Sequence, residues 1–358
     1  MGYLAPNCRH RIVALTPAAG HVNHFAFMAA RKNLLIVLFV IGLALFIFLI
    51  LRIGPAEIWA TVRQLTWTSV LVLFALRSLF WIQRTYIWKL LFESQGGRAP
   101  FFTLFWARMA GYAFSYVTPA GQLSGEAVRV LVVKAKNRRL ALASVVVDKT
   151  MELLTAFLFA TGSLVLTLLS GSLPGPYKML FLCVTAGVGL ATAFLIIKQR
   201  TGMFSAIIGV LTKLGIRLRV IEKNREKIAE TDAAIADIYA RRKKLVVQIF
   251  FLNVLSMLLW SLEIYLTVIF LGVRTMNLLD STLVVSLGIL AFVILIIPGS
   301  LGTYEAVFVL LFSFFGVDTI RGMAVTLIRR VLALVWVGAG MTAMGLLLKG
   351  SKGKPSAT

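Results

Sequence analysis

Pro119-Ala-Gly-Gln-Leu-Ser-Gly-Glu126-Ala-Val128 is the stretch that decides the fold, because the chain repeats its pattern at Pro298-Gly-Ser-Leu-Gly-Thr-Tyr-Glu305-Ala-Val307. Each copy has a Pro, four residues, a Ser or Thr, one residue, and then Glu-Ala-Val. Each copy also interrupts an apolar run, and Pro and Gly break helices. The predicted break residues are Pro119, Gly121, Gly125, Pro298, Gly299 and Gly302. Both stretches therefore predict a helix–break–helix hairpin.

Each break is followed by residues that favour the start of a helix. Ser124 and Thr303 are good N-caps, and the Glu two places later would lie in the first turn, where the helix dipole favours an anion. Broken apolar segments at corresponding positions in two halves of a chain are typical of a transporter's binding site. The alternative is two ordinary turns that match by chance.

The composition is that of a membrane protein with many spans. Hydrophobic residues make up 59% of the chain, charged residues only 14%, and the mean hydropathy is +0.90. The apolar runs have helix length and lack the alternation of a β-barrel, so we expect an all-α polytopic fold. The net charge of +23 lies mostly between the apolar runs, as the positive-inside rule predicts, and requires no nucleic-acid partner.

Six apolar runs predict full membrane spans, and two shorter broken ones predict the hairpins. The spans are expected at 34–51, 69–92, 140–169, 177–197, 245–271 and 322–348, and the hairpins at 101–134 and 281–316. Each half of the chain then reads span, span, hairpin, span. Hairpin arms of ~14–17 residues reach only ~21–26 Å, against ~30 Å of hydrocarbon, which favours re-entrant hairpins over pairs of short spans.

The distribution of Lys and Arg predicts the topology. It places both termini on the cytoplasmic side, so the two hairpins open from opposite sides and the two halves form an inverted repeat. The expected parts are a polar leader at 1–30, a first repeat at 31–171, a second repeat at 172–349 that contains a basic cytoplasmic connection at 198–244, and a basic tail at 350–358. The leader is either a disordered extension or the result of a start placed upstream of Met28.

The sequence contains none of the motifs of nucleotide, metal or histidine chemistry. All three histidines precede the first predicted span. Cys8 lies in the polar leader and Cys183 in an apolar run, so the two cysteines predict no disulfide framework. Walker A, GxGxxG and HExxH patterns are absent. We therefore expect no metal and no cofactor, and any transport would be passive or driven by an ion gradient.

Charged side chains inside the predicted membrane segments are the candidate binding residues. Each costs about 2.5–3.5 kcal/mol on insertion scales, so it must be paired or line a wet cavity. Any one alone is equally explained as a structural ion pair. Together they predict a polar cavity for a phospholipid or other anionic amphiphile, because arginine binds phosphate and carboxylate in bidentate fashion. The candidate substrate-binding residues are Arg77, Arg84, Arg108, Gln122, Glu126, Arg129, Asp148, Glu152, Glu263, Tyr304, Glu305, Arg329 and Arg330.

These motifs resemble the lysylphosphatidylglycerol synthase transmembrane-region family. The resemblance rests on Val117–Arg129, Ala141–Glu152 and Ile297–Glu305, with Arg329 and Arg330 downstream, and it extends from Leu34 to Leu348. The second motif, Pro-Gly-x-Leu-Gly-x-Tyr-Glu, is the more specific. The first departs from the family's usual Gly-Gly-Glu because it reads Ser124-Gly125-Glu126.

The resemblance implies a flippase-like protein of bacteria or archaea, in some members associated with hopanoids. It implies translocation of lipid between leaflets, or associated lipid trafficking. Some members carry a fused soluble aminoacyl-transferase domain, which we do not expect after Lys349.

Three functions are compatible with the sequence. The first is a flippase-like transporter of the bacterial inner membrane for a phospholipid, hopanoid or lipid-linked substrate. The second is a lipid-modifying enzyme in which Asp148 and Glu152, one helical turn apart, transfer protons. The third is a scaffold that recruits a lipid-synthesis enzyme through the 198–244 connection. The sequence specifies neither the lipid nor the oligomeric state.

Overall fold

The computed structural model is all-helical and contains no strand among the residues that it describes. These are residues 37, 40–118, 122–133, 138–170, 178–199, 205, 208–209, 212, 240–294 and 301–352. The predicted leader, most of the 198–244 connection and the end of the tail lie outside this set, as do Pro119, Gly121, Pro298 and Gly299.

The helices follow one another in two series of similar length. They are Val40–Ile53, α2 Pro55–Val62, α3 Trp67–Ser94, α4 Phe101–Val117, α5 Gln122–Val132, α6 Arg138–Ser170, α7 Lys178–Gln199, α11 Lys243–Phe270, α12 Leu278–Ile294, α13 Thr303–Ser313 and α14 Thr319–Lys352. Both α3 and α11 have 28 residues, both α4 and α12 have 17, and both α5 and α13 have 11. α6 has 33 residues and α14 has 34.

Four helices are long and apolar enough to cross a membrane, namely Trp67–Ser94, Leu140–Ser170, Lys243–Phe270 and Thr319–Leu346. They coincide with four of the six predicted spans, and the protein is therefore a multi-pass membrane protein. The described part of α7 contributes a shorter apolar helix, Lys178–Phe194.

The first predicted span, 34–51, ends in a bend. The helix Val40–Ile53 and α2 meet at an angle of 82°, and counted together they would be a fifth span. Gly54 sits at the bend with a φ of 109°, and Pro55 opens α2. A positive φ is readily adopted only by glycine, and proline is favoured in a first helical turn, so this Gly-Pro pair turns the chain.

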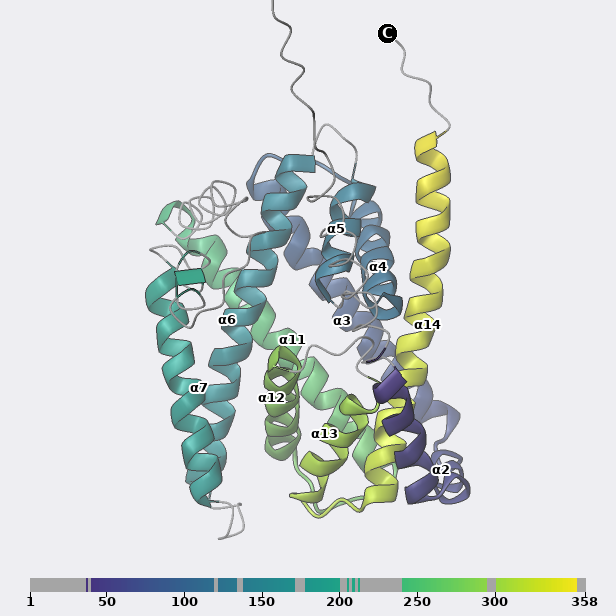
Figure 1. The fold of residues 1–358 in the computed structure, drawn as a ribbon. Coiled ribbons are helices and arrows are strands. Elements are labelled where there is room, and N and C mark those ends of the chain that lie inside the picture. The colour runs from purple at the N-terminus through teal and green to yellow at the C-terminus, as the bar shows by residue number, and fades with distance from the viewer. Residues whose placement is uncertain are drawn as a thin grey trace, which may run out of the picture.

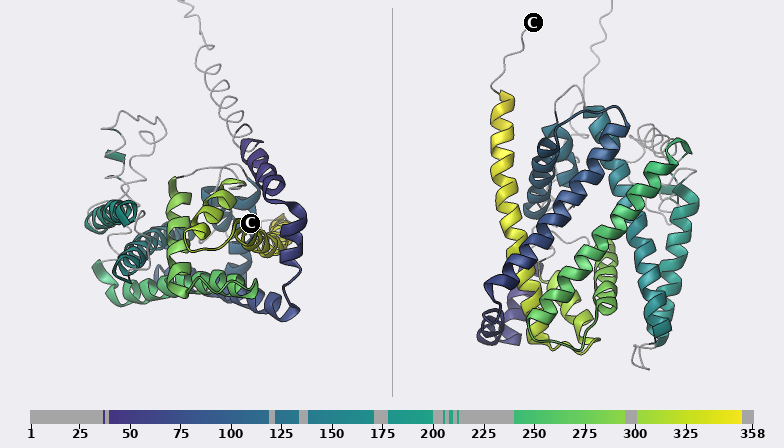
Figure 2. Two further views of the ribbon diagram at one scale, coloured as in Figure 1. Left: turned by 90° about the horizontal axis from the view of Figure 1, so that it is seen from below. Right: turned by 180° about the vertical axis from the view of Figure 1, so that it is seen from behind.

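The two broken segments occupy opposite halves of the molecule. In Figure 1, α4 and α5 lie side by side in the upper half, whereas α12 and α13 lie in the lower half. α4 packs on α14, and α12 packs correspondingly on α6. α3 and α11 pack against each other along the back of the bundle, as Figure 2 shows from behind.

The helix starts after the breaks differ in part from the prediction. α13 begins at Thr303 with Gly302 as its N-cap, so Thr303 is not the cap, but Glu305 does lie in the first turn. α5 begins at Gln122, which places Ser124 inside the helix and Glu126 beyond its first turn. The reason is that Gln, Leu and Ser are all compatible with a helix, so nothing after Gly121 delays its start.

The packing is apolar outside as well as inside. Phe308 and Phe312 of α13 are fully buried in the largest core cluster, together with Ile264 of α11. Large side chains such as Leu169 and Leu190 are more than 70% exposed. An apolar exterior around buried charges is what a lipid environment requires.

Candidate functional site

Asp148 of α6 is the centre of a first group of buried charges. One carboxylate oxygen, Oδ2, accepts from Arg108 of α4 at 2.7 Å and from Arg129 of α5 at 2.9 Å, and Oδ1 accepts from Arg84 of α3 at 3.4 Å. The Asp148 side chain is fully buried and the three arginines are 3–6% exposed. One carboxylate therefore holds three guanidinium groups from three other helices.

The first group also has an edge that is accessible. Lys149 Nζ lies 3.2 Å from Glu126 Oε1 and 3.0 Å from Glu152 Oε2. The side chains of Lys149, Glu126 and Glu152 are 34%, 17% and 29% exposed. Behind this edge, Arg129 pairs with Glu126, and Arg84 donates to Glu152 at 2.6 Å. We call these seven residues the first cluster: Arg84, Arg108, Glu126, Arg129, Asp148, Lys149 and Glu152.

An aromatic ring and a side-chain amide complete the first cluster. The guanidinium carbons of Arg129 and Arg108 lie 4.2 Å and 5.8 Å from the centre of the buried Trp88 ring, within range of cation–π attraction. Arg84 also donates to Asn253 of α11. The described part of the chain offers no hydrogen-bond partner for the buried Nε atoms of Arg108 and Arg129.

Glu263 of α11 is at the centre of a second group. Its Oε1 lies 2.5 Å from Arg77 of α3 and 3.6 Å from Arg329 of α14. Arg329 Nε donates to the hydroxyl of Tyr304 at 2.8 Å, and its guanidinium stacks 5.3 Å from the Trp260 ring centre. Glu263 therefore bridges two arginines from two helices.

Tyr304 connects this group to Arg330, whose guanidinium carbon lies 5.5 Å from the centre of the Tyr304 ring. The fully buried carboxylate of Glu305 accepts from the Gly302 N–H at 2.8 Å and from two nitrogens of Arg330. Arg330 also donates through Nη1 to the hydroxyl of Tyr116, near the end of α4, at 2.9 Å. We call the five charged residues here the second cluster: Arg77, Glu263, Glu305, Arg329 and Arg330. Arg330 thus joins the start of α13 to the end of α4.

A match to a known protein family covers most of the chain. The sequence profile of the lysylphosphatidylglycerol synthase TM region matches residues 34–340, which include both hairpins and every member of the two clusters. The chain belongs to this family. Among curated proteins, a search finds no match. Membership in the lysylphosphatidylglycerol synthase TM family links this membrane protein to lipid biology.

The structure places eleven of the thirteen predicted binding residues of this family member in the two clusters. Tyr304 joins the second through Arg329. The side chain of Gln122 lies outside the described set. The charges pair directly with one another across helices, and their role in binding a substrate stays a prediction. In the described segments no three His, Cys, Asp or Glu side chains lie together as a metal site would need.

Lys149, Asn253 and Tyr116 contact the charged residues but were not predicted. Lys149 could have been found by aligning the two halves of the chain. Asp148-Lys149 begins 22 residues after Glu126, and Arg329-Arg330 begins 24 residues after Glu305. Asn253 and Tyr116 had no such signal, since neither belongs to a motif that the two halves share.

The two arms of the first hairpin touch backbone to backbone. A Cβ atom at Gly125 of α5 would collide with the Gly111 carbonyl oxygen of α4 and with Ser115 Oγ, which already accepts from the Gly125 N–H at 3.1 Å. We therefore expect Gly125→Ala to lower the thermal unfolding midpoint in detergent, because overpacking typically costs about 1–3 kcal/mol.

Gly162→Ala is the matched control for Gly125→Ala. Gly162 lies within α6 with nothing within 4 Å of the added Cβ, so alanine should be neutral or slightly stabilising there. Equal midpoints for the two variants would show that the contact between α4 and α5 is looser than described.

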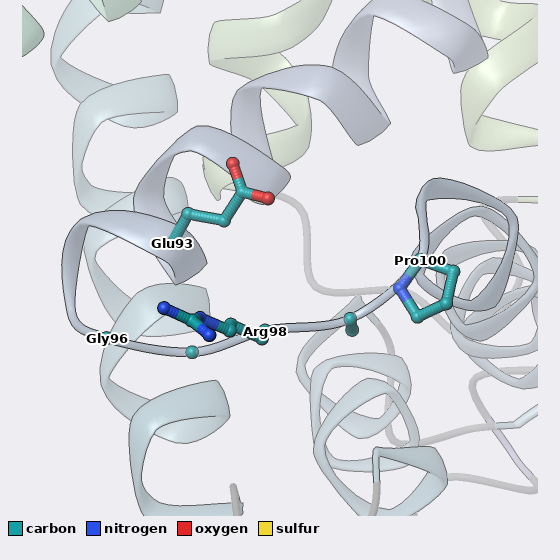
Figure 3. Close-up of a pocket in the computed structure, with 6 residues that line it drawn as sticks. Glu93, Gly96, Arg98 and Pro100 are labelled. Atoms are coloured by element: carbon teal, nitrogen blue, oxygen red, sulfur yellow. The ribbon is translucent and has the colours of Figure 1, made fainter.

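A surface pocket of about 630 Å³ lies away from both clusters, in the loop between α3 and α4 (Figure 3). It is lined by Glu93, Gly96, Gly97, Arg98, Ala99 and Pro100. It contains no member of either cluster, so the paired charges and not this pocket are the candidate site.

Proposed function

We propose that this protein moves a polar or anionic lipid between the leaflets of the bacterial inner membrane, in the manner of a flippase. Two features carry the proposal: buried clusters of opposite charges within an apolar bundle, and a broken-helix hairpin attached to each cluster. A lipid headgroup must pass the hydrocarbon region in contact with polar groups, and the family match links this chain to lipid biology.

The charge balance supports an anionic headgroup. The first cluster has four basic and three acidic side chains, and the second has three and two. Each therefore has one basic group in excess. Within the described chain, the buried Nε atoms of Arg77, Arg108 and Arg129 lack hydrogen-bond partners. Guanidinium groups with unused donors suit phosphate or carboxylate oxygens.

An inverted repeat is part of the proposal. The equal lengths of α3 and α11 support it, as do the corresponding contacts of α4 with α14 and of α12 with α6. The ion pairs correspond as well. Arg84 precedes Glu126 by as many residues as Glu263 precedes Glu305, and Arg84 pairs with Asp148 as Glu263 pairs with Arg329. The charges are reversed between the two pairs: α3 carries the base and α6 the acid, whereas α11 carries the acid and α14 the base. On this proposal the hairpins are re-entrant from opposite sides, and both termini are cytoplasmic.

Leaflet exchange in liposomes tests the function. Wild-type protein is reconstituted with fluorescently labelled phosphatidylglycerol or phosphatidylethanolamine, and a membrane-impermeant quencher reports how much label reaches the outer leaflet. We expect faster exchange than in protein-free liposomes. No exchange with either lipid would contradict the proposal, and a new lipid product found by mass spectrometry would favour the enzyme alternative.

A further inference from the structure

Lys149 and Arg330 occupy corresponding places in the two halves, and each holds the glutamate of its own hairpin. Lys149 of α6 pairs with Glu126 of α5, and Arg330 of α14 pairs with Glu305 of α13. Each basic residue directly follows the residue that pairs with α3 or α11, Asp148 or Arg329. In both halves, then, a basic side chain of a long helix pairs with the glutamate of the hairpin's second arm. In the first half, Asp148 of α6 also binds Arg129 of α5 at 2.9 Å.

The ion pair of Lys149 with Glu126 is weaker than that of Arg330 with Glu305. Two nitrogens of Arg330 bind the two oxygens of the fully buried Glu305, and a third binds Tyr116. Lys149 offers one ammonium group, shared between Glu126 and Glu152, and its side chain is 34% exposed against 12% for Arg330. A rigid bidentate fork holds a carboxylate more firmly than a flexible point charge, and exposure weakens an ion pair further.

The consequences of release also differ. If Lys149 moves away, Glu126 still pairs with Arg129, and Glu152 still accepts from Arg84 at 2.6 Å. No buried carboxylate is left without a counter-charge. If Arg330 moves away, Glu305 loses the cation that pairs with it in the described structure, and an uncompensated buried charge is strongly destabilising. Release of Lys149 from its partners therefore costs less free energy than release of Arg330 from Glu305.

We propose that Lys149 is the releasable latch of the first hairpin and that Arg330 is the fixed anchor of the second. When Lys149 releases Glu126, α5 turns about the buried pair of Arg129 with Asp148, which stays closed, while α13 stays on α14. This inference rests on the proposed lipid transport, because the movement would open the accessible edge of the first cluster to a headgroup. Lys149 is a positioning residue in this scheme: it acts through Glu126 and Glu152.

A reciprocal exchange of the two residues tests the latch. Full-length wild-type, Lys149→Arg and Arg330→Lys proteins are reconstituted in lipid nanodiscs, and amide hydrogen exchange is followed in peptides from α5 and α13. Arginine at 149 should slow exchange in α5 by about fivefold, and lysine at 330 should speed exchange in α13 by a similar factor, since one hydrogen bond contributes about 1 kcal/mol. In liposomes, Lys149→Arg should also slow lipid exchange.

Lys89→Arg is the matched control for Lys149→Arg. Lys89 pairs with Glu93 on α3 at 2.7 Å with a similar side-chain exposure of 28%, and it lies outside both clusters. It should change neither measurement. Unchanged hydrogen exchange in α5 of Lys149→Arg would overturn the latch, whatever the lipid assay gives. Slower hydrogen exchange in α5, in a protein whose wild type moves no lipid, would support the latch and contradict the transport function.

Discussion

Asp148→Asn should destabilise the protein by about 3–5 kcal/mol, the usual effect of removing one partner from a buried ion pair. The substitution preserves the shape of the side chain but removes the negative charge that Arg84, Arg108 and Arg129 share. Arg108 would lose its ion-pair partner among the described residues. Because these arginines come from α3, α4 and α5, the loss should loosen the whole first half. A lower thermal unfolding midpoint in detergent would measure it.

Asp318→Asn is the control for Asp148→Asn. Asp318 directly precedes α14 and pairs with Arg321 in the first turn of that helix at 2.7 Å, and the two side chains are 44% and 45% exposed. Partial burial alone would raise the pKa of Asp318, but hydrogen bonds from Arg321 outweigh it and hold the pKa below its usual value. Exposed pairs contribute little, so the midpoint should stay near that of wild type. Equal midpoints for both variants would mean that Asp148 does not organise the first half.

The broken segments were predictable because Pro and Gly act locally. Pro119 and Pro298 interrupt apolar runs in the sequence, and a helix lies before and after each break. α5 and α13 nevertheless begin earlier than Ser124 and Thr303 as N-caps would place them. The bend after Ile53 has the same kind of signal in Gly54-Pro55. The sequence did not reveal that the chain would turn there by 82°, because the angle depends on the packing of α2 against α14.

The division of the charges into two clusters could not be predicted from the sequence. Arg77 and Arg84 lie two turns apart on α3, and helical spacing places both on one face. They nevertheless belong to different clusters, because α11 crosses α3 and presents Glu263 to one and Asn253 to the other. A pairing of this kind depends on the angle between two helices, which no local pattern of residues encodes.

Glu305→Gln should reduce leaflet exchange by at least about tenfold while the protein still inserts, since a change of about 1.4 kcal/mol suffices for that factor. The amide can still accept from the Gly302 N–H, so the start of α13 keeps its cap. It cannot neutralise Arg330, which also reaches Tyr116 at the end of α4. The link between the two hairpins should therefore weaken without unfolding α13.

Glu57→Gln provides the comparison that makes this result specific. Glu57 undergoes the same chemical change in the first turn of α2, where its side chain is exposed and belongs to neither cluster. It should exchange labelled lipid at the wild-type rate, with equal amounts of each protein in the liposomes. If Glu305→Gln also exchanges lipid at that rate, the carboxylate is a structural ion-pair partner and has no part in transport. If only Glu305→Gln is slow, the buried charge between the hairpins is required for the lipid to cross, because the two variants differ in where the charge is lost and not in its chemistry.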